Sequence, residues 1–140
     1  MKKLLYIISA LLLMAACGKN GGDNTELTLE QKLCGQWHST SITIDGDIYI
    51  DFAQTKTFEL YQQIGEGAHR LYRGTWNLER DLLTGKYNDG EDWASAYQIA
   101  IEGDVLTMTS GNDAAETSTY RKSEIPAEVK ETCETVVKSR

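Results

Sequence analysis

The clearest pattern in the chain is an alternation of apolar and polar residues with a period of two, which continues to about residue 120. This period is typical of half-buried β-strands, because successive side chains of a strand point to opposite faces of a sheet. Turn residues divide the pattern into eight strands. Their alternating residues are, strand by strand, Ile42 and Ile44; Ile48, Ile50 and Phe52; Phe58 and Leu60; Tyr72, Gly74 and Trp76; Leu83, Gly85 and Tyr87; Tyr97, Ile99 and Ile101; Leu106 and Met108; and Tyr120.

The links between these strands are all short. Asp45-Gly46 predicts a two-residue hairpin turn. A parallel crossover needs a dozen or more residues, and no link supplies them, so we expect each strand to run antiparallel to the next. The other turns are expected near Thr55-Lys56, Ile64–Ala68, Glu79–Asp81, Asn88–Asp92, Gly103-Asp104 and Gly111–Asp113.

An antiparallel sheet of eight strands with one apolar face can bury that face and remove its edges by closing on itself. The predicted fold is therefore all-β, an eight-stranded antiparallel up-and-down barrel. The alternative is a two-sheet sandwich of the same strands. In a regular strand, Trp37 would point to the opposite face from Ile42 and Ile44, because it is separated from them by an odd number of positions. A β-bulge must therefore lie between them if all three face inward.

Short helices are predicted on both sides of the strands. Thr28 and Gln31 have the spacing of a capping box, so a helical turn is expected before the first strand. After the last strand the period changes, and Pro126 suits the first turn of a helix. The apolar residues of this segment recur at helical spacing and predict a short amphipathic helix on the barrel wall; they are Ile125, Val129, Cys133 and Val136.

The first sixteen residues have the pattern of a signal peptide. Lys2 and Lys3 form a positive n-region, an apolar run follows over residues 4–14, and the small pair Ala15-Ala16 precedes Cys17. The apolar run is too short to remain as a transmembrane helix, which needs about 20 residues. We therefore expect residues 1–16 to be removed during export.

Leu13-Met14-Ala15-Ala16-Cys17 resembles the lipobox of bacterial lipoproteins. The resemblance implies that Cys17 is acylated, for example with palmitate, and becomes the first residue of the mature chain. Gly18 after the cysteine resembles lipoproteins sent to an outer membrane, on a face that the sequence leaves open. Residues 17–27 would then be the lipidated cysteine and a flexible tether, and residues 28–140 the barrel domain. Ordinary secretion is the alternative.

Composition and charge narrow the class of partner. With 140 residues, 41% of them hydrophobic, the chain has room for one domain with a core. Its formal net charge is −7, and loss of Lys2 and Lys3 would make the mature chain more acidic still. This balance argues against nucleic acid and against polybasic attraction to lipid headgroups. The acyl chains would have to provide the membrane anchor, and a protein partner is not indicated by the sequence.

Gly35-Gln36-Trp37, just after the predicted helical turn and at the start of the first strand, resembles the Gly-x-Trp motif of lipocalins. In that family the tryptophan closes one end of the barrel under an arginine that follows the last strand. Arg121 stands in the corresponding position, so the resemblance implies a Trp37–Arg121 pair. It is closest to compact bacterial lipocalin-like lipoproteins, which implies binding of a small apolar or amphipathic ligand.

The residues whose positions in the strands point into the barrel are candidates for lining a ligand pocket. Such a pocket would be apolar and aromatic, as small-molecule sites usually are. The alternative is that these side chains simply fill a small barrel. A cavity smaller than about 300 Å³ would exclude the carrier interpretation. The candidate residues are Phe58, Tyr72, Trp76, Tyr87, Tyr97, Met108 and Tyr120.

Cys34 and Cys133 remain as an even pair once Cys17 is acylated. In an oxidising compartment such a pair predicts a disulfide, which would hold the C-terminal helix beside the first strand. The alternative is two buried free thiols.

No catalytic constellation is evident, so we do not expect an enzyme or a cofactor. His38 and His69 lack the spacing of metal ligands, and no metal is expected. The competing function is a non-catalytic structural or interaction module with a filled barrel, in which Tyr49 and Tyr61 would be exposed on the outer face to contact another protein.

Overall fold

The computed structural model describes residues 26–111 and 115–136. The proposed signal peptide, Cys17, most of the tether and part of the turn at Gly111–Asp113 lie outside these residues. No helix in the described part of the chain is long and apolar enough to cross a membrane. The elements, in chain order, are α1 (Leu29–Leu33), β1 (Gly35–Ser41), β2 (Gly46–Phe52), β3 (Thr57–Ile64), β4 (Arg70–Glu79), β5 (Leu82–Tyr87), β6 (Tyr97–Glu102), β7 (Val105–Ser110), β8 (Thr117–Lys122), α2 (Ala127–Thr132) and β9 (Glu134–Thr135).

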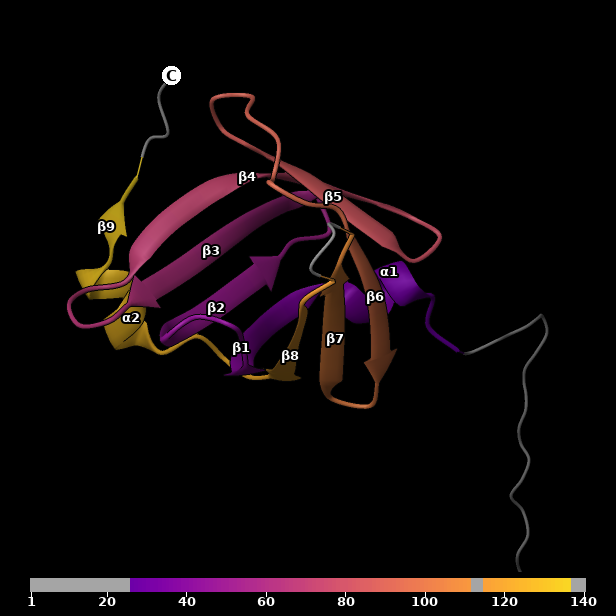
Figure 1. Ribbon diagram of the computed structural model, residues 1–140, viewed down its shortest axis with the longest axis horizontal. Coiled ribbons are helices and arrows are strands. Elements are labelled where there is room, and N and C mark those ends of the chain that lie inside the picture. Colours follow the sequence, from indigo (N-terminus) through magenta and orange to yellow (C-terminus); the bar gives the residue numbers. More distant parts are fainter. Residues whose placement is uncertain (1–25, 112–114, 137–140) are drawn as a thin grey trace, which may run out of the picture.

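Strands β1 to β8 form a closed, up-and-down barrel, as predicted (Figure 1). Each strand pairs antiparallel with the next, and the β1–β8 pairing closes the ring. This closure excludes the two-sheet sandwich. The weakest seam lies between β5 and β6, which share only the pairs Leu82–Gln98 and Leu83–Tyr97. The rest of β5 does not pair with β6. It is covered by the loop of residues 88–96, whose Asp92 forms an isolated bridge with Lys86 of β5.

Most of the predicted turns are confirmed, but the two-residue turn at Asp45-Gly46 is wrong. Strand β1 ends at Ser41, and Gly46 is already the first residue of β2, paired with Ile64. The loop therefore spans residues 42–45. The predicted β-bulge is confirmed, because the β1–β8 register shifts between Ser39 and Ser41.

Helix α1 closes one end of the barrel, next to a tightly packed core. The predicted capping box is present, since the Thr28 and Gln31 side chains each bond the other residue's backbone N–H. The Trp37 indole donates a hydrogen bond to the carbonyl of Leu33, at 2.8 Å. Both residues are fully buried, with 0% exposure. The half of the barrel next to α1 is therefore filled by side chains.

The cation over Trp37 is Lys122, so the predicted pair with Arg121 is wrong. The Lys122 Nζ atom lies 4.4 Å from the centre of the Trp37 ring. The reason is the alternation along a strand: Lys122 is directly opposite Trp37 in the β1–β8 register, whereas Arg121 is opposite His38 and points outward. Lys122 also donates to the carbonyl of Cys34, at 2.8 Å, which joins the last strand to the start of the first.

Helix α2 packs on the outer face of β3 and β4 and forms a second, smaller core. Ile125 and Val129 are buried there against Tyr61 and Leu71. The short strand β9 then adds to the start of β4 in parallel orientation. The predicted amphipathic helix is thus confirmed, although it ends at Thr132 and leaves Val136 beyond it. The expectation that Tyr61 is exposed is wrong, since only 3% of it is accessible.

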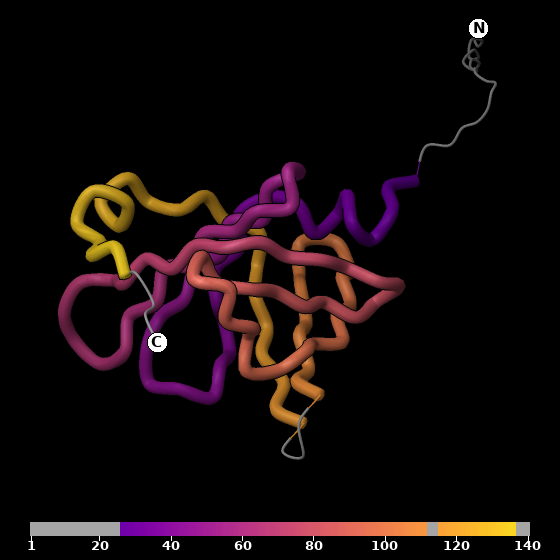
Figure 2. Tube along the Cα trace, turned by 90° about the horizontal axis from the view of Figure 1, so that it is seen from above, coloured from indigo at the N-terminus to yellow at the C-terminus, as the bar shows by residue number. Residues whose placement is uncertain are grey.

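The predicted disulfide is not formed, and Cys34 and Cys133 are free thiols. Cys34 packs beside the main core next to α1, whereas Cys133 packs against the cluster under α2. Figures 1 and 2 show α1 and α2 on opposite sides of the molecule. The C-terminal helix therefore docks away from the start of the first strand, and the two sulfur atoms cannot meet.

Candidate functional site

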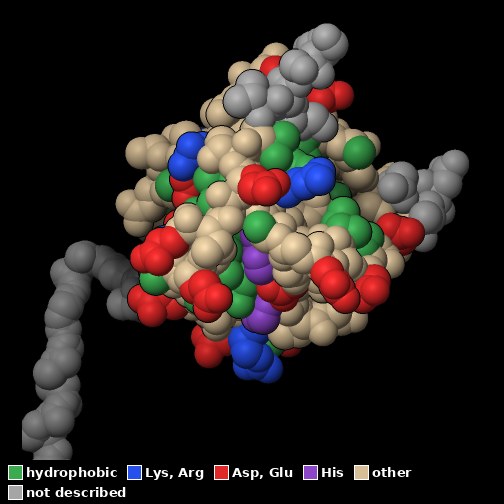
Figure 3. Space-filling view, turned by 90° about the vertical axis from the view of Figure 1, so that its left-hand side faces the viewer, with side chains coloured by type: hydrophobic (Ala, Val, Ile, Leu, Met, Phe, Trp, Pro, Cys, Tyr) green, Lys and Arg blue, Asp and Glu red, His purple; other side chains and the backbone are tan. Residues whose placement is uncertain are grey.

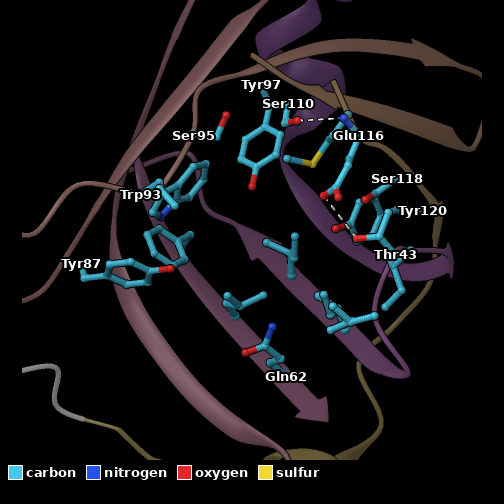
Figure 4. Close-up of a pocket in the computed structure, with 18 residues that line it drawn as sticks. Thr43, Gln62, Tyr87, Trp93, Ser95, Tyr97, Ser110, Glu116, Ser118 and Tyr120 are labelled. Atoms are coloured by element: carbon cyan, nitrogen blue, oxygen red, sulfur yellow. Dashed lines mark hydrogen bonds between the residues drawn. The ribbon is translucent and has the colours of Figure 1, made fainter. Parts of the chain in front are cut away.

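A cavity of about 370 Å³ occupies the end of the barrel opposite α1 (Figure 4). Its inner residues Phe58, Met108 and Tyr120 are buried, whereas Ile44 and Glu116 at the rim are exposed. The cavity is therefore a cup that opens to solvent. The complete lining is Ile42, Thr43, Ile44, Ile48, Ile50, Phe58, Leu60, Gln62, Tyr87, Trp93, Ala94, Ser95, Tyr97, Met108, Ser110, Glu116, Ser118 and Tyr120.

The structure brings together five of the seven residues that the sequence suggested for a pocket. Trp76 and Tyr72 do not line the cavity. Trp76 belongs to the filled end, where its ring packs edge-on against Phe52 and its Nε1 donates to the carbonyl of Thr57, at 3.0 Å. The Tyr72 ring lies 5.9 Å from the ring of the lining residue Tyr87, measured between centroids. The residues that do line the cavity are Phe58, Tyr87, Tyr97, Met108 and Tyr120.

One wall of the cavity is aromatic and is completed by the loop of residues 88–96. Trp93 from this loop packs edge-on against Phe58 and Tyr97, with ring centroids 5.2 and 6.1 Å away. Its backbone N–H donates to the carbonyl of Gly85, at 2.9 Å. The indole lies directly on Gly85, where any Cβ atom would come within 2.3 Å of the ring. The absence of a side chain at Gly85 thus allows Trp93 to cover the β5–β6 seam.

The Trp93 indole contributes a further polar feature. Its Nε1 atom is buried and has no hydrogen-bond partner among the residues that the structure describes. A buried N–H without an acceptor costs about 1–3 kcal/mol.

Among the described residues of the lining, Glu116 is the only one with a charged side chain. The backbone N–H of Glu116 donates to the Ser110 hydroxyl, at 2.9 Å, and its carbonyl accepts from the Ser110 backbone, at 2.8 Å. The Thr43 hydroxyl lies 3.5 Å from the carboxylate, the outer limit of a hydrogen bond. These contacts hold the carboxylate at the rim, and no Lys, Arg or His in the described part of the chain forms an ion pair with it.

Two phenols place hydroxyl groups near this carboxylate. Burial, and then the Glu116 charge, raise the pKa of Tyr97. Burial, together with Tyr97, raises the pKa of Tyr120 to about 12, against a smaller opposing effect of a hydrogen bond with Ser118. Both phenols therefore stay protonated at neutral pH. They offer uncharged donors and acceptors beside a single negative charge.

The two histidines lie together on the outer face of the barrel, away from the cavity (Figure 3). Asp47 bridges them, with its oxygens 2.6 Å from Nε2 of His38 and 3.0 Å from Nε2 of His69. Burial alone would raise the pKa of Asp47, but the hydrogen bonds from His69 and His38 lower it below its ordinary value. Tyr49 stacks on His38 at 4.1 Å, so this predicted contact residue is engaged within the chain.

This outer cluster is not arranged as a metal site. Asp47 occupies the space between the two rings, and no group of three or more His, Cys, Asp or Glu residues among those described could hold a metal ion. The arrangement is that of a structural polar network joining β1, β2 and the start of β4.

Sequence reasoning missed Trp93, Glu116 and Ser118 as lining residues, whereas Ser95 and Ser110 share the inward position of the predicted pocket residues and do line the cavity. Trp93 is in a loop whose acidic sequence indicated only a solvated turn. Glu116 precedes the last strand, and the alternation of apolar and polar residues that identifies this strand does not extend to it. The available signal was Gly85, a glycine at an inward position of a strand, which often marks the close approach of another group.

No protein-family model matches the sequence, and no curated protein matches it either. What the cavity binds must therefore be argued from its own residues and their geometry.

Proposed function

We propose that this protein is a lipid-anchored, lipocalin-like binding protein of the cell envelope, which holds a small apolar or amphipathic molecule in the open half of its barrel. The observation that carries the proposal is the cavity itself. Its volume of about 370 Å³ exceeds the limit of about 300 Å³ below which a carrier is not tenable. The function is one of binding rather than catalysis.

The division of the barrel interior supports this proposal. The end beside α1 is filled by fully buried side chains such as Trp37 and Leu106. At the other end, an aromatic wall faces hydroxyl groups, which is the composition of many small-molecule sites. A barrel that served only as a filled interaction module would have packed side chains at this end as well.

The competing function, a filled interaction module, required Tyr49 and Tyr61 to be exposed on the outer face of the barrel, and the structure does not support this. Tyr61 is buried under α2, and Tyr49 is stacked on His38. Neither phenol offers a free aromatic face to a protein partner.

The membrane part of the proposal rests on the lipobox that ends at Cys17. Two or three acyl chains would hold the protein firmly at a membrane, with the outer membrane favoured by Gly18. Changing Cys17→Ala should move the protein from the membrane fraction to the soluble fraction. A protein that remains in the membrane fraction would exclude a lipid anchor at Cys17.

Ligand binding can be tested with an uncharged fluorescent probe, N-phenyl-1-naphthylamine, whose emission rises in apolar surroundings. We expect the Cys17→Ala protein to enhance its emission saturably. Ser118→Phe, which places a ring in the cavity, should abolish the effect. Thr117→Phe is the matched control, because Thr117 is the neighbouring residue of β8 and is exposed. Binding that survives Ser118→Phe, or no binding at all, would contradict the proposal.

A further inference from the structure

The two sides of the cavity differ in chemistry, and the difference selects a class of ligand. Figure 4 shows Tyr87 and Trp93 on one side, and Glu116, Ser118 and Tyr120 on the other. The first side is aromatic. The second carries hydroxyl groups and the carboxylate of Glu116. A bound molecule that satisfies both sides needs an apolar body and a polar head.

The charge of that head is restricted by Glu116. The lining residues that the structure describes include no Lys, Arg or His that would balance an anionic head. A fatty acid would place its carboxylate beside that of Glu116, and like charges repel each other. The chain as a whole carries a net charge of −7, which adds to this preference against anions.

Glu116 is also held ready for a cation. Two hydrogen bonds with Ser110 fix its backbone, and the Thr43 hydroxyl lies beside its carboxylate. No cationic side chain in the described part of the chain competes for it, as the ion pairs found there involve other carboxylates. A positioned carboxylate at the mouth of an apolar cavity is thus available to a ligand.

We infer that the ligand is an amphiphilic organic cation: a protonated amine that pairs with Glu116, on an apolar body that packs against Phe58 and Trp93. The inference rests on the proposed binding function and adds the charge of the head group to it. The protonated amine donates to the Glu116 carboxylate, and the Ser118 hydroxyl lies on the same side as a further acceptor. An uncharged head would bind more weakly, and a carboxylate most weakly.

A matched series tests the charge while keeping the apolar body constant. Octylamine, octanol and octanoate share an eight-carbon chain and differ in head-group charge. Each is used to displace N-phenyl-1-naphthylamine from the Cys17→Ala protein in low-salt buffer. We expect octylamine to displace the probe at the lowest concentration and octanoate at the highest.

Variants separate pairing with Glu116 from general attraction to an acidic protein. Glu116→Gln should weaken octylamine about two- to fivefold, as for an accessible charged pair, and leave octanol unchanged. Glu102→Gln removes the same charge from an exposed residue at the far end of β6 and should change neither ligand.

The outcomes distinguish the two proposals. Equal effects of Glu116→Gln and Glu102→Gln, or strongest displacement by octanoate, would overturn the cation inference and leave the binding function standing. If the unmodified cavity takes up neither the probe nor any of the three compounds, the binding function fails, and the inference fails with it.

Discussion

Replacing Gly85 by alanine tests whether the Trp93 indole forms the wall of the cavity. In the structure, a Cβ atom at Gly85 would lie 2.3 Å from Cε2 and 2.5 Å from Cζ2 of Trp93. Carbon atoms in ordinary contact are about 3.5–4.0 Å apart. The ring would therefore have to move by more than about 1 Å, and with it the loop of residues 88–96.

The magnitude follows from two opposing effects. Glycine inside a strand ordinarily costs about 0.5–1 kcal/mol relative to alanine, so the substitution alone would be stabilising. Overpacking a filled contact costs about 1–3 kcal/mol. We expect a net loss of about 1–2 kcal/mol. With a urea slope of about 2 kcal/mol per molar, in the middle of the range for small proteins, the midpoint should fall by about 0.5–1 M.

The assay is urea unfolding followed by circular dichroism, with Gly111→Ala as the control. A Cβ atom at Gly111 meets only the carbonyl oxygen of Ala96, at 3.4 Å, so this change should leave the midpoint unchanged or raise it slightly. The Trp93→Ala background supplies the decisive comparison, because the clash is absent there and Gly85→Ala should no longer destabilise. An equal loss in both backgrounds would refute the reasoning.

Three further predictions concern other parts of the barrel. Lys122→Met should lower the free energy of unfolding by about 1–2 kcal/mol, whereas Arg121→Ala should change it by less than about 0.5 kcal/mol, as urea midpoints would show. Because hydrogen bonds lower the pKa of Asp47 in the folded state, its ionised form adds stability above about pH 4, which is lost as the pH falls through the lowered pKa. The stability advantage over Asp47→Asn should therefore be present at pH 5 and shrink towards pH 3. Alkylation of the unfolded Cys17→Ala protein without reductant should modify both Cys34 and Cys133, and a mass without two adducts would reveal a disulfide.

The barrel could be predicted because its determinants are local. A period of two and short links leave an antiparallel meander as the natural arrangement, and closure follows from the need to bury one face. The bulge near Ser39 followed from parity alone. The error at Arg121 was avoidable by the same argument, since Tyr120 faces inward and its second neighbour Lys122 must do so too.

The position of the C-terminal helix could not be predicted from the pairing of cysteines. Its docking site is set by apolar residues on the outer face of the barrel, Tyr61 and Leu71. Tyr61 was expected to be exposed because its position in the strand points it away from the barrel interior. A large apolar side chain on the solvent face of a strand is better taken as a sign that another element covers it.

The candidate site was predicted only where it is built from strands. Phe58, Tyr97 and Met108 have inward parity and line the cavity, whereas Trp93 and Glu116 come from irregular segments placed by tertiary contacts. Whether inward side chains fill a barrel or leave it hollow depends on how they pack in three dimensions. In this barrel both occur, one at each end.

The most direct test of a hollow, ligand-binding barrel uses its methionine. Met108 is 4% exposed and lines the inner part of the cavity, and the other methionines, Met1 and Met14, belong to the proposed signal peptide. Labelling methionine methyl groups with ¹³C should thus give a single resonance in the mature protein. The account predicts that octylamine shifts this resonance saturably and shows nuclear Overhauser effects to it. A Met108 signal that stays unchanged while octylamine binds elsewhere would contradict it.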